Sequence, residues 1–193
     1  MKDATPAEVD RLEIPDGAIF TQLAASGNAT FALTDTGLVY GWGTFRDHSK
    51  VTCIKGGIQH SIAVTENGEC LVWGRLDGYA TGMKLDNLPA ERTIRDLRDS
   101  PRNLKVPTPI PELDAVFAAA GSDHSIAITK DHKAFSWSFN VDRQTGQKTA
   151  DDVECVTLLD HPSIKGKRLV WAGAGGQYSM LGAEDDSVVN DGY

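Results

Sequence analysis

The first candidates for chemistry in this 193-residue sequence are two His-Ser dipeptides, His60-Ser61 and His124-Ser125. A serine nucleophile and a histidine base are common partners in acyl transfer, but their side chains must lie within hydrogen-bonding reach of each other. Both dipeptides open stretches in which apolar and small residues alternate, so adjacent side chains point to opposite faces of a strand. We therefore expect no hydrolase pair within either dipeptide.

Other reactive groups are equally uninformative about catalysis. The sequence has no G-x-x-x-x-G-K-[ST] loop for phosphates and no cluster of residues with metal-ligand spacing. Cys53, Cys70 and Cys155 are odd in number and lack the C-x-x-C spacing of redox or metal sites, so we expect buried free thiols. The sequence predicts no enzyme with covalent chemistry, no metal, no cofactor and no direct nucleotide binding.

Charge and composition restrict the partners. The formal net charge is −8, and an acidic surface repels phosphate backbones, which disfavours non-specific nucleic-acid binding. No apolar run approaches the roughly 20 residues that a membrane helix needs, so we expect no membrane contact. A reducing compartment, cytosol or nucleus, fits the unpaired cysteines.

The His-Ser dipeptides belong to an internal repeat. Residues 58–74 (IQHSIAVTENGECLVWG) and 122–138 (SDHSIAITKDHKAFSWS) match in register, and residues 27–43 (GNATFALTDTGLVYGWG) form a third copy. Aligned on Trp42, Trp73 and Trp137, the three copies share Thr and Ala positions, while His132 stands where the other two have glycine. A fourth, partial copy lies at 172–182.

Each copy has the alternation of a β-hairpin. Ile62 and Val64 point to one face and Ala63 to the other, and Asn67-Gly68 is typical of a tight turn with positive φ angles. A second strand over 69–73 follows, and residues 51–57 predict another strand upstream. Small sheets repeated around an axis form a β-propeller, in which we expect the tryptophans to pack between blades; a stacking platform for nucleic acid is the alternative.

The domain boundaries follow from this pattern. We predict an N-terminal extension over 1–17 with a short helix near 6–12, the repeats over 18–183, and an acidic tail over 184–193. A polar, proline-rich excursion is expected at 84–111, with a solvated mixture of charges. Its basic residues are Arg92, Arg95, Arg98, Arg102 and Lys105.

These motifs together resemble the regulator of chromosome condensation repeat family. The resemblance rests on glycine, His-Ser, the alternating apolar residues, Thr, Asn-Gly and Trp-Gly in one register, and on Gly-Gly-Gln-Tyr-Ser at 175–179, which is similar to the family's closing repeat. Within the family, the sequence is most like the C-terminal half of the fungal exchange factor for the small GTPase Ran. The positions carrying the repeat are Trp42, Gly43, Gly56, Gly57, Gly68, Trp73, Gly74, Gly82, Gly121, Trp137, Gly146, Gly175 and Gly176.

The resemblance implies an all-β fold: a partial β-propeller of about three to four four-stranded antiparallel blades, half of a seven-bladed ring. It implies a guanine nucleotide exchange factor for a Ran-type GTPase, acting in nuclear transport and in chromosome and spindle regulation. Localisation would be the nucleus, with cytoplasm as the alternative. Chromatin contact is implied for a full-length member, but we do not expect it of this chain.

For the GTPase-binding face, the resemblance and the loop positions single out five residues: Gln59, His60, Arg75, Asp77 and His124. The alternatives are a conformational role for both histidines, which would bond a neighbouring loop, and a solvated pair for Arg75 and Asp77.

The expected half ring also limits activity. Trp42 and Trp73 are 31 residues apart, whereas a four-stranded blade takes roughly 40–50, so a stretch expected between Arg46 and Val51 is missing. The front blades, which carry the family's wedge against the GTPase, are also missing. We expect a truncated chain that is weak or inactive in exchange alone. Two alternatives stay open: a non-enzymatic propeller scaffold for another protein, and a damaged or split chain without independent activity.

Overall fold

The computed structural model describes residue 17 and residues 19–25, 30–35, 39–41 and 51–184. The predicted helix near 6–12, Trp42, Gly43, the stretch between Arg46 and Val51 and the tail beyond Glu184 lie outside the described residues. The described elements are β1 (Phe20–Ala25), β2 (Thr30–Thr34), β3 (Val39–Gly41), β4 (Val51–Gly56), β5 (His60–Thr65), β6 (Glu69–Arg75), η1 (Asp77–Tyr79), η2 (Leu85–Asn87), η3 (Ala90–Arg92), β7 (Thr93–Arg95), β8 (Pro101–Ala120), β9 (His124–Thr129), β10 (Ala134–Ser138), β11 (Val153–Leu158), β12 (Leu169–Gly175) and β13 (Tyr178–Ala183).

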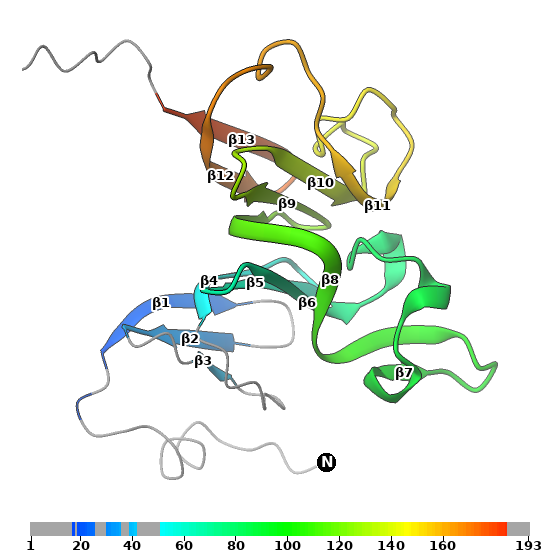
Figure 1. Ribbon diagram of the computed structural model, residues 1–193. Helices are drawn as coiled ribbons and strands as arrows, with labels where there is room; N and C mark the ends of the chain where they lie inside the picture. Colours follow the sequence, from blue (N-terminus) through cyan, green and yellow to red (C-terminus); the bar gives the residue numbers. More distant parts are fainter. Residues whose placement is uncertain (1–16, 18, 26–29, 36–38, 42–50, 185–193) are drawn as a thin grey trace, which may run out of the picture.

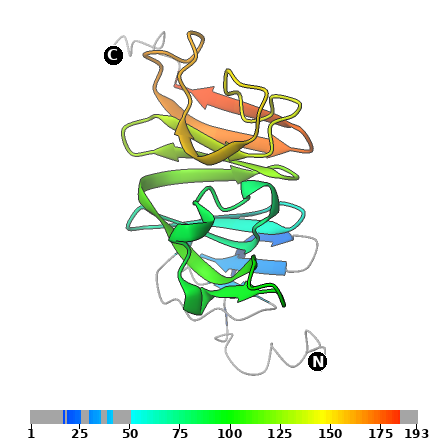
Figure 2. The same cartoon turned by 90° about the vertical axis from the view of Figure 1, so that its right-hand side faces the viewer.

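The strands form four antiparallel blades stacked side by side (Figures 1 and 2). The first blade is β1–β2–β3. The second is β4–β5–β6 with the N-terminal part of β8, and the third is the C-terminal part of β8 with β9, β10 and β11. The fourth is β12–β13. The all-β prediction is confirmed, and two blades are four-stranded among the described residues.

Strand β8 connects the second and third blades and bends between them (Figure 1). Its residues Asn103 to Asp114 pair with β6, and Ala115 to Ala120 pair with β9. The polar excursion predicted over 84–111 is therefore too long: its second half is the outer strand of the second blade. The prolines misled the prediction, since an outer strand tolerates the missing N–H donors.

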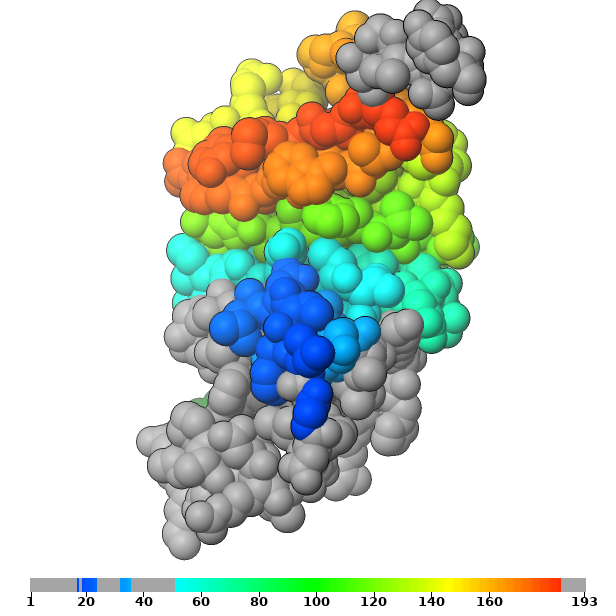
Figure 3. Space-filling model, turned by 90° about the vertical axis from the view of Figure 1, so that its left-hand side faces the viewer, coloured from blue at the N-terminus to red at the C-terminus, as the bar shows by residue number. Residues whose placement is uncertain are grey.

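Each pair of neighbouring blades buries its own apolar core, and we call these interfaces seams. Ile62, Val64, Cys70 and Val72 face the third blade, while Ala63, Leu71 and Trp73 face the first. The alternation predicted for the hairpin is thus confirmed, with both faces apolar. Every residue of β5 and of β9 is buried, because each strand lies in the middle of a blade covered on both sides. Figure 3 shows the blades as successive bands from blue to red.

The hairpin turn differs in one detail from its prediction. Gly68 has φ +92°, and its N–H donates to Thr65 O at 3.0 Å, but Asn67 is not in the left-handed region. One positive φ is sufficient for this turn. In the next copy His132 takes the same place with φ +61°, its N–H donating to Thr129 O at 2.9 Å. Its ring compensates for the strain: Nδ1 donates to Leu169 O at 3.0 Å, and Nε2 accepts from Arg168 Nε at 2.8 Å.

Trp137 anchors the seam between the second and third blades. Its indole is fully buried, and Nε1 donates to Ala80 O at 3.1 Å. We expect Trp137→Ala to lower the free energy of unfolding by about 3–5 kcal/mol, since it leaves a cavity and an unpaired carbonyl. Urea denaturation measures the change.

Leu97→Ala is the matched control, because Leu97 is fully exposed in the excursion. Its effect should stay within about 0.5 kcal/mol. If the two variants lost similar free energies of unfolding, the Trp137 indole would not be an anchor of the seam.

Candidate functional site

His60 and His124 occupy equivalent places in the seams, not on the surface. His60 is 2% exposed and His124 is not exposed. His60 Nε2 lies 2.9 Å from Ser125 Oγ of the third blade, and His124 Nε2 lies 2.9 Å from Ser179 Oγ of the fourth. Each histidine thus joins its blade to the serine that the next copy holds in the same register.

The glycine three residues before each histidine makes room for the ring. A Cβ at Gly57 would lie 2.3 Å from His60 Cε1, and one at Gly121 would lie 2.1 Å from His124 Cε1. Such distances exclude any larger residue without displacement of the imidazole. The glycine and the histidine of the repeat are therefore one packing unit.

The hydrogen bonds of His124 define its tautomer. Ser179 Oγ donates its only proton to Gln144 O at 2.8 Å, so it must accept from His124 Nε2–H. His124 Nδ1 is then the unprotonated nitrogen, and it is buried without a hydrogen-bond partner among the described residues. Burial lowers the pKa of His124, and it lowers the pKa of His60 to about 4, with repulsion from the protonated form of His124 as the second cause.

A hydrolytic role does not follow from these pairs. Ser125 and His60, which belong to different dipeptides, are within hydrogen-bonding reach of each other, whereas the prediction concerned only pairs within one dipeptide. Both side chains are buried, so no substrate can reach the hydroxyl. The repeat in the sequence contains the signal for this contact. In a radial repeat, the histidine of one His-Ser dipeptide lies beside the serine at the equivalent place in the next copy.

The surface candidates come together at one edge of the second blade, where β6 ends beside the turn between β4 and β5. Arg75 Nη1 donates to Gln59 Oε1 at 2.7 Å, and Arg75 Nε donates to Asp77 Oδ2. The main chain fixes the pair, since Arg75 N donates to Gln59 O at 2.8 Å. Arg75 and Asp77 are about half exposed, so the two charges stay available to a partner.

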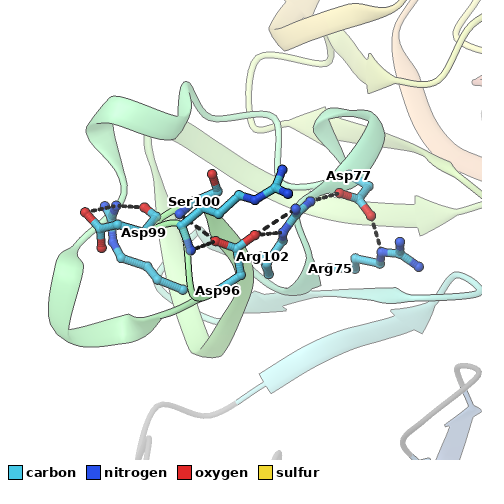
Figure 4. Close-up of polar contacts among 8 residues, drawn as sticks. Arg75, Asp77, Asp96, Asp99, Ser100 and Arg102 are labelled. Atoms are coloured by element: carbon cyan, nitrogen blue, oxygen red, sulfur yellow. Dashed lines mark hydrogen bonds and ion pairs between the residues drawn. The ribbon is translucent and has the colours of Figure 1, made fainter.

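The excursion extends this cluster with residues that the sequence did not single out as a site. Arg102 Nη1 lies 3.9 Å from Asp77 Oδ1, and Arg102 Nη2 lies 2.8 Å from Asp96 Oδ2 (Figure 4). Asp96 also accepts from the backbone N–H groups of Ser100 and Arg98, and these bonds, with that from Arg102, hold its pKa below the usual range. We call Gln59, Arg75, Asp77, Asp96 and Arg102 the charged edge.

Two hollows adjoin the charged edge. One, of about 390 Å³, lies between Gln59, Arg75, Asp77 and Arg102. The other, of about 330 Å³, extends from Gln59 and Asp77 across the seam to Asp123 and Asp152, with His60 in its wall. Four of the five predicted contact residues, Gln59, His60, Arg75 and Asp77, therefore share one region, whereas His124 lies one seam away.

The arrangement suits recognition of a polar protein surface. Alternating acids and arginines at the rim of an interface steer and orient a charged partner. Within the described residues, no group of three or more His, Cys, Asp or Glu side chains could hold a metal ion. That part of the chain also has no helix long and apolar enough to cross a membrane.

The fold is a repeat-built, partial β-propeller, and the charged edge lies on the surface of its second blade. The regulator of chromosome condensation (RCC1) repeat matches residues 20–47. Protein pim1 of Schizosaccharomyces pombe is 36% identical over 146 residues, which cover 72% of this chain and 27% of pim1. The guanine nucleotide exchange factor SRM1 of Saccharomyces cerevisiae is 32% identical over 140 residues, covering 70% of this chain and 28% of SRM1.

The crystal structure of Prp20p from Saccharomyces cerevisiae, described with its binding to Gsp1p and histones, aligns with a TM-score of 0.77 and 25% identity. The alignment covers 86% of this chain and 44% of Prp20p. The chain thus matches the RCC1 repeat over residues 20–47 and is similar to fungal proteins that include an exchange factor, and the predicted partial propeller is confirmed. It spans about a quarter of the length of the curated relatives.

The buried imidazole of His60 should make the protein less stable in acid. Its pKa is lowered from 6.5 to about 4, so the unfolded chain binds this proton more readily than the folded chain. The free energy of unfolding should therefore be fully retained above about pH 6.5 and decline as the pH falls from there towards 4, by at most about 3 kcal/mol for this group. Urea denaturation across this range measures the decline.

His60→Gln, which stays neutral, should remove the share of the decline that His60 contributes. His161→Gln is the control, because His161 is exposed and bonds only locally to Ser163. If the free energy of unfolding declines equally with falling pH in the His60→Gln variant and in the unaltered chain, His60 is not the titrating group.

Proposed function

We propose that this chain is part of a guanine nucleotide exchange factor for a Ran-type small GTPase, working in the nucleus without covalent chemistry. The observation that carries the proposal is the combination of SRM1, an exchange factor by name, with the propeller of Prp20p, which aligns over 86% of this chain. The GTPase would be a protein partner, and the nucleotide would stay bound to the GTPase until release.

The mechanism requires only differential binding. An exchange factor that binds the nucleotide-free GTPase more tightly than the loaded form weakens nucleotide binding by the same factor, because the two equilibria are linked. Such a factor needs a rigid surface that fixes one conformation of its partner. The seams supply rigidity here, since both faces of β5 are buried and its edges are paired to β4 and β6.

The charged edge is the contact surface that we propose for the GTPase. Gln59, Arg75 and Asp77 point outward from fixed backbone positions, and Arg102 and Asp96 continue the same row of charges. His60 and His124 are buried, so their part would be indirect: they would hold the blades that present this edge.

Reversing one charge on this edge tests the contact. Asp77→Lys should weaken binding to the nucleotide-free GTPase about tenfold, because it places a third cation between Arg75 and Arg102. Titration calorimetry measures the Kd. Asp160→Lys reverses an exposed acid on the third blade and should leave the Kd unchanged. If both variants lost affinity equally, the change in net charge would be the cause, not the loss of the contact at Asp77.

Exchange by the isolated chain should be weak. The chain spans 28% of SRM1, so most of the length of this relative has no counterpart in it. We expect less than tenfold acceleration of the release of a fluorescent GDP analogue from a Ran-type GTPase. A larger acceleration, equivalent to more than about 1.4 kcal/mol in the barrier, would contradict this expectation.

A pull-down separates the exchange factor from the other class of function. Retention of the nucleotide-free GTPase, but not of the loaded form, supports the proposal. Failure to retain either form would favour a propeller scaffold that binds another protein, the alternative that the repeat leaves open.

A further inference from the structure

The turn between β7 and β8 contains a serine followed by a proline, Ser100-Pro101, beside the charged edge. Proline-directed kinases select serine or threonine before proline, because proline has no N–H that would remain without a partner in their substrate groove. The sequence contains three such dipeptides, Thr5-Pro6, Ser100-Pro101 and Thr108-Pro109, of which the first lies outside the described residues. The structure distinguishes the other two.

Thr108 is closed to a kinase. It is 4% exposed, its hydroxyl donates to Val106 O at 3.0 Å, and its backbone pairs with Val72 inside the second blade. The hydroxyl could enter the groove of a kinase only if this blade opened. Thr108 is therefore an internal control for any modification of the folded chain.

Ser100 is accessible. It is partly exposed, and its hydroxyl makes no hydrogen bond to a described residue. The bonds around it are local, since Ser100 N donates to Asp96 Oδ1 at 3.0 Å and Asp96 N donates to Ser100 O at 2.9 Å. The proline that follows favours an extended backbone at Ser100. A turn held by such local bonds opens at little cost and leaves the blades intact.

The side chain of Arg102 lies where a phosphate on Ser100 could reach it. Ser100 and Arg102 share one acceptor: Arg102 Nε donates to Asp96 Oδ2 at 2.9 Å, and Ser100 N donates to the other oxygen of the same carboxylate (Figure 4). Side chains two residues apart in an extended segment point to the same side. A guanidinium binds a phosphate more strongly than a neutral donor does, whereas the Asp96 carboxylate repels it.

We propose that Ser100 is a phosphorylation site for a proline-directed kinase, and that its phosphate binds Arg102 in place of Asp77 and Asp96. In the transfer, Ser100 Oγ attacks the γ-phosphorus of ATP. The new Oγ–P bond replaces the bond from that phosphorus to the β,γ-bridging oxygen, and ADP leaves. The hydroxyl proton passes to the catalytic base of the kinase.

The modification changes the charge of the whole edge. The two arginines and two aspartates of the charged edge have formal charges that cancel, and a phosphoserine adds about −1.5 to −2 at pH 7. Asp77 keeps Arg75 as its cation but loses Arg102. The edge then favours a basic partner surface and disfavours an acidic one. This goes beyond the proposed exchange function and does not depend on it, because the charge changes whichever partner binds.

Incubation of the full 193-residue chain with ATP, Mg²⁺ and a purified cyclin-dependent kinase tests the acceptor. Peptide mapping by mass spectrometry should find phosphate on Ser100 and none on Thr108, a comparison within one unaltered chain. Pro101→Ala should slow the modification of Ser100 at least about tenfold, because it restores the N–H. Pro89→Ala, in the same excursion but after a leucine, is the matched control and should leave the rate unchanged.

Three results of this assay overturn the proposal. They are the absence of phosphate on Ser100, a rate that Pro101→Ala does not change, and equal modification of Thr108 and Ser100. In the last case accessibility would not select the acceptor.

A phosphorus-31 NMR titration of the phosphorylated chain tests the contact with Arg102. The second pKa of a phosphoserine is about 6, and a bound guanidinium lowers this pKa because it favours the dianion. The pKa of the phosphate should therefore be higher in Arg102→Gln than in the otherwise unaltered phosphorylated chain. Arg143→Gln, which removes an exposed arginine of the third blade, should leave it unchanged. Equal pKa values in Arg102→Gln and the unaltered chain overturn the proposed contact.

Discussion

The described structure depends on the burial of apolar blade faces against neighbouring blades. A sheet with an apolar face must bury that face against another element, and here β5 and β9 are covered on both sides. The seams are held in two ways: by apolar clusters that meet between blades, and by the His60–Ser125 and His124–Ser179 bonds, which fix each blade relative to the next. The histidines remain uncharged because this burial disfavours their protonated form.

The position of the charged edge follows from the same packing. Gln59 lies in the turn before β5 and Arg75 at the end of β6, so antiparallel pairing of these two strands brings them to one edge. The excursion reaches this edge because β8 returns along β6, and Leu76 N donates to Arg102 O at 3.0 Å. Loops on a rigid scaffold can thus present side chains in fixed positions at little cost in entropy.

Much of the fold was predictable, because the residue pattern of each repeat determines its strands and turns locally. The strands over 51–57, 60–65 and 69–73, the turn at Gly68 and the burial of Trp73 and Trp137 all follow from alternation and register. Three features did not. The His–Ser pairs join residues 65 and 55 positions apart, and the contact between Asp77 and Arg102 depends on the path of β8. The third feature is β8 itself, because its prolines suggested a loop. The strand tolerates them because the edge that does not pair with β6 or β9 is paired only with the three residues of β7.

A stack held together by seams transmits stability chiefly between neighbours. The second blade has described neighbours on both sides, and its charged edge therefore rests on a blade that is packed on both faces. The fourth blade has one described neighbour, and its strand β13 leaves apolar side chains and backbone groups open. Ser179 of β13 bonds to His124 of the third blade, and Ser125 of the third blade bonds to His60 of the second blade, which carries the charged edge. The two surfaces are thus linked by one chain of contacts, with the two buried histidines at its junctions.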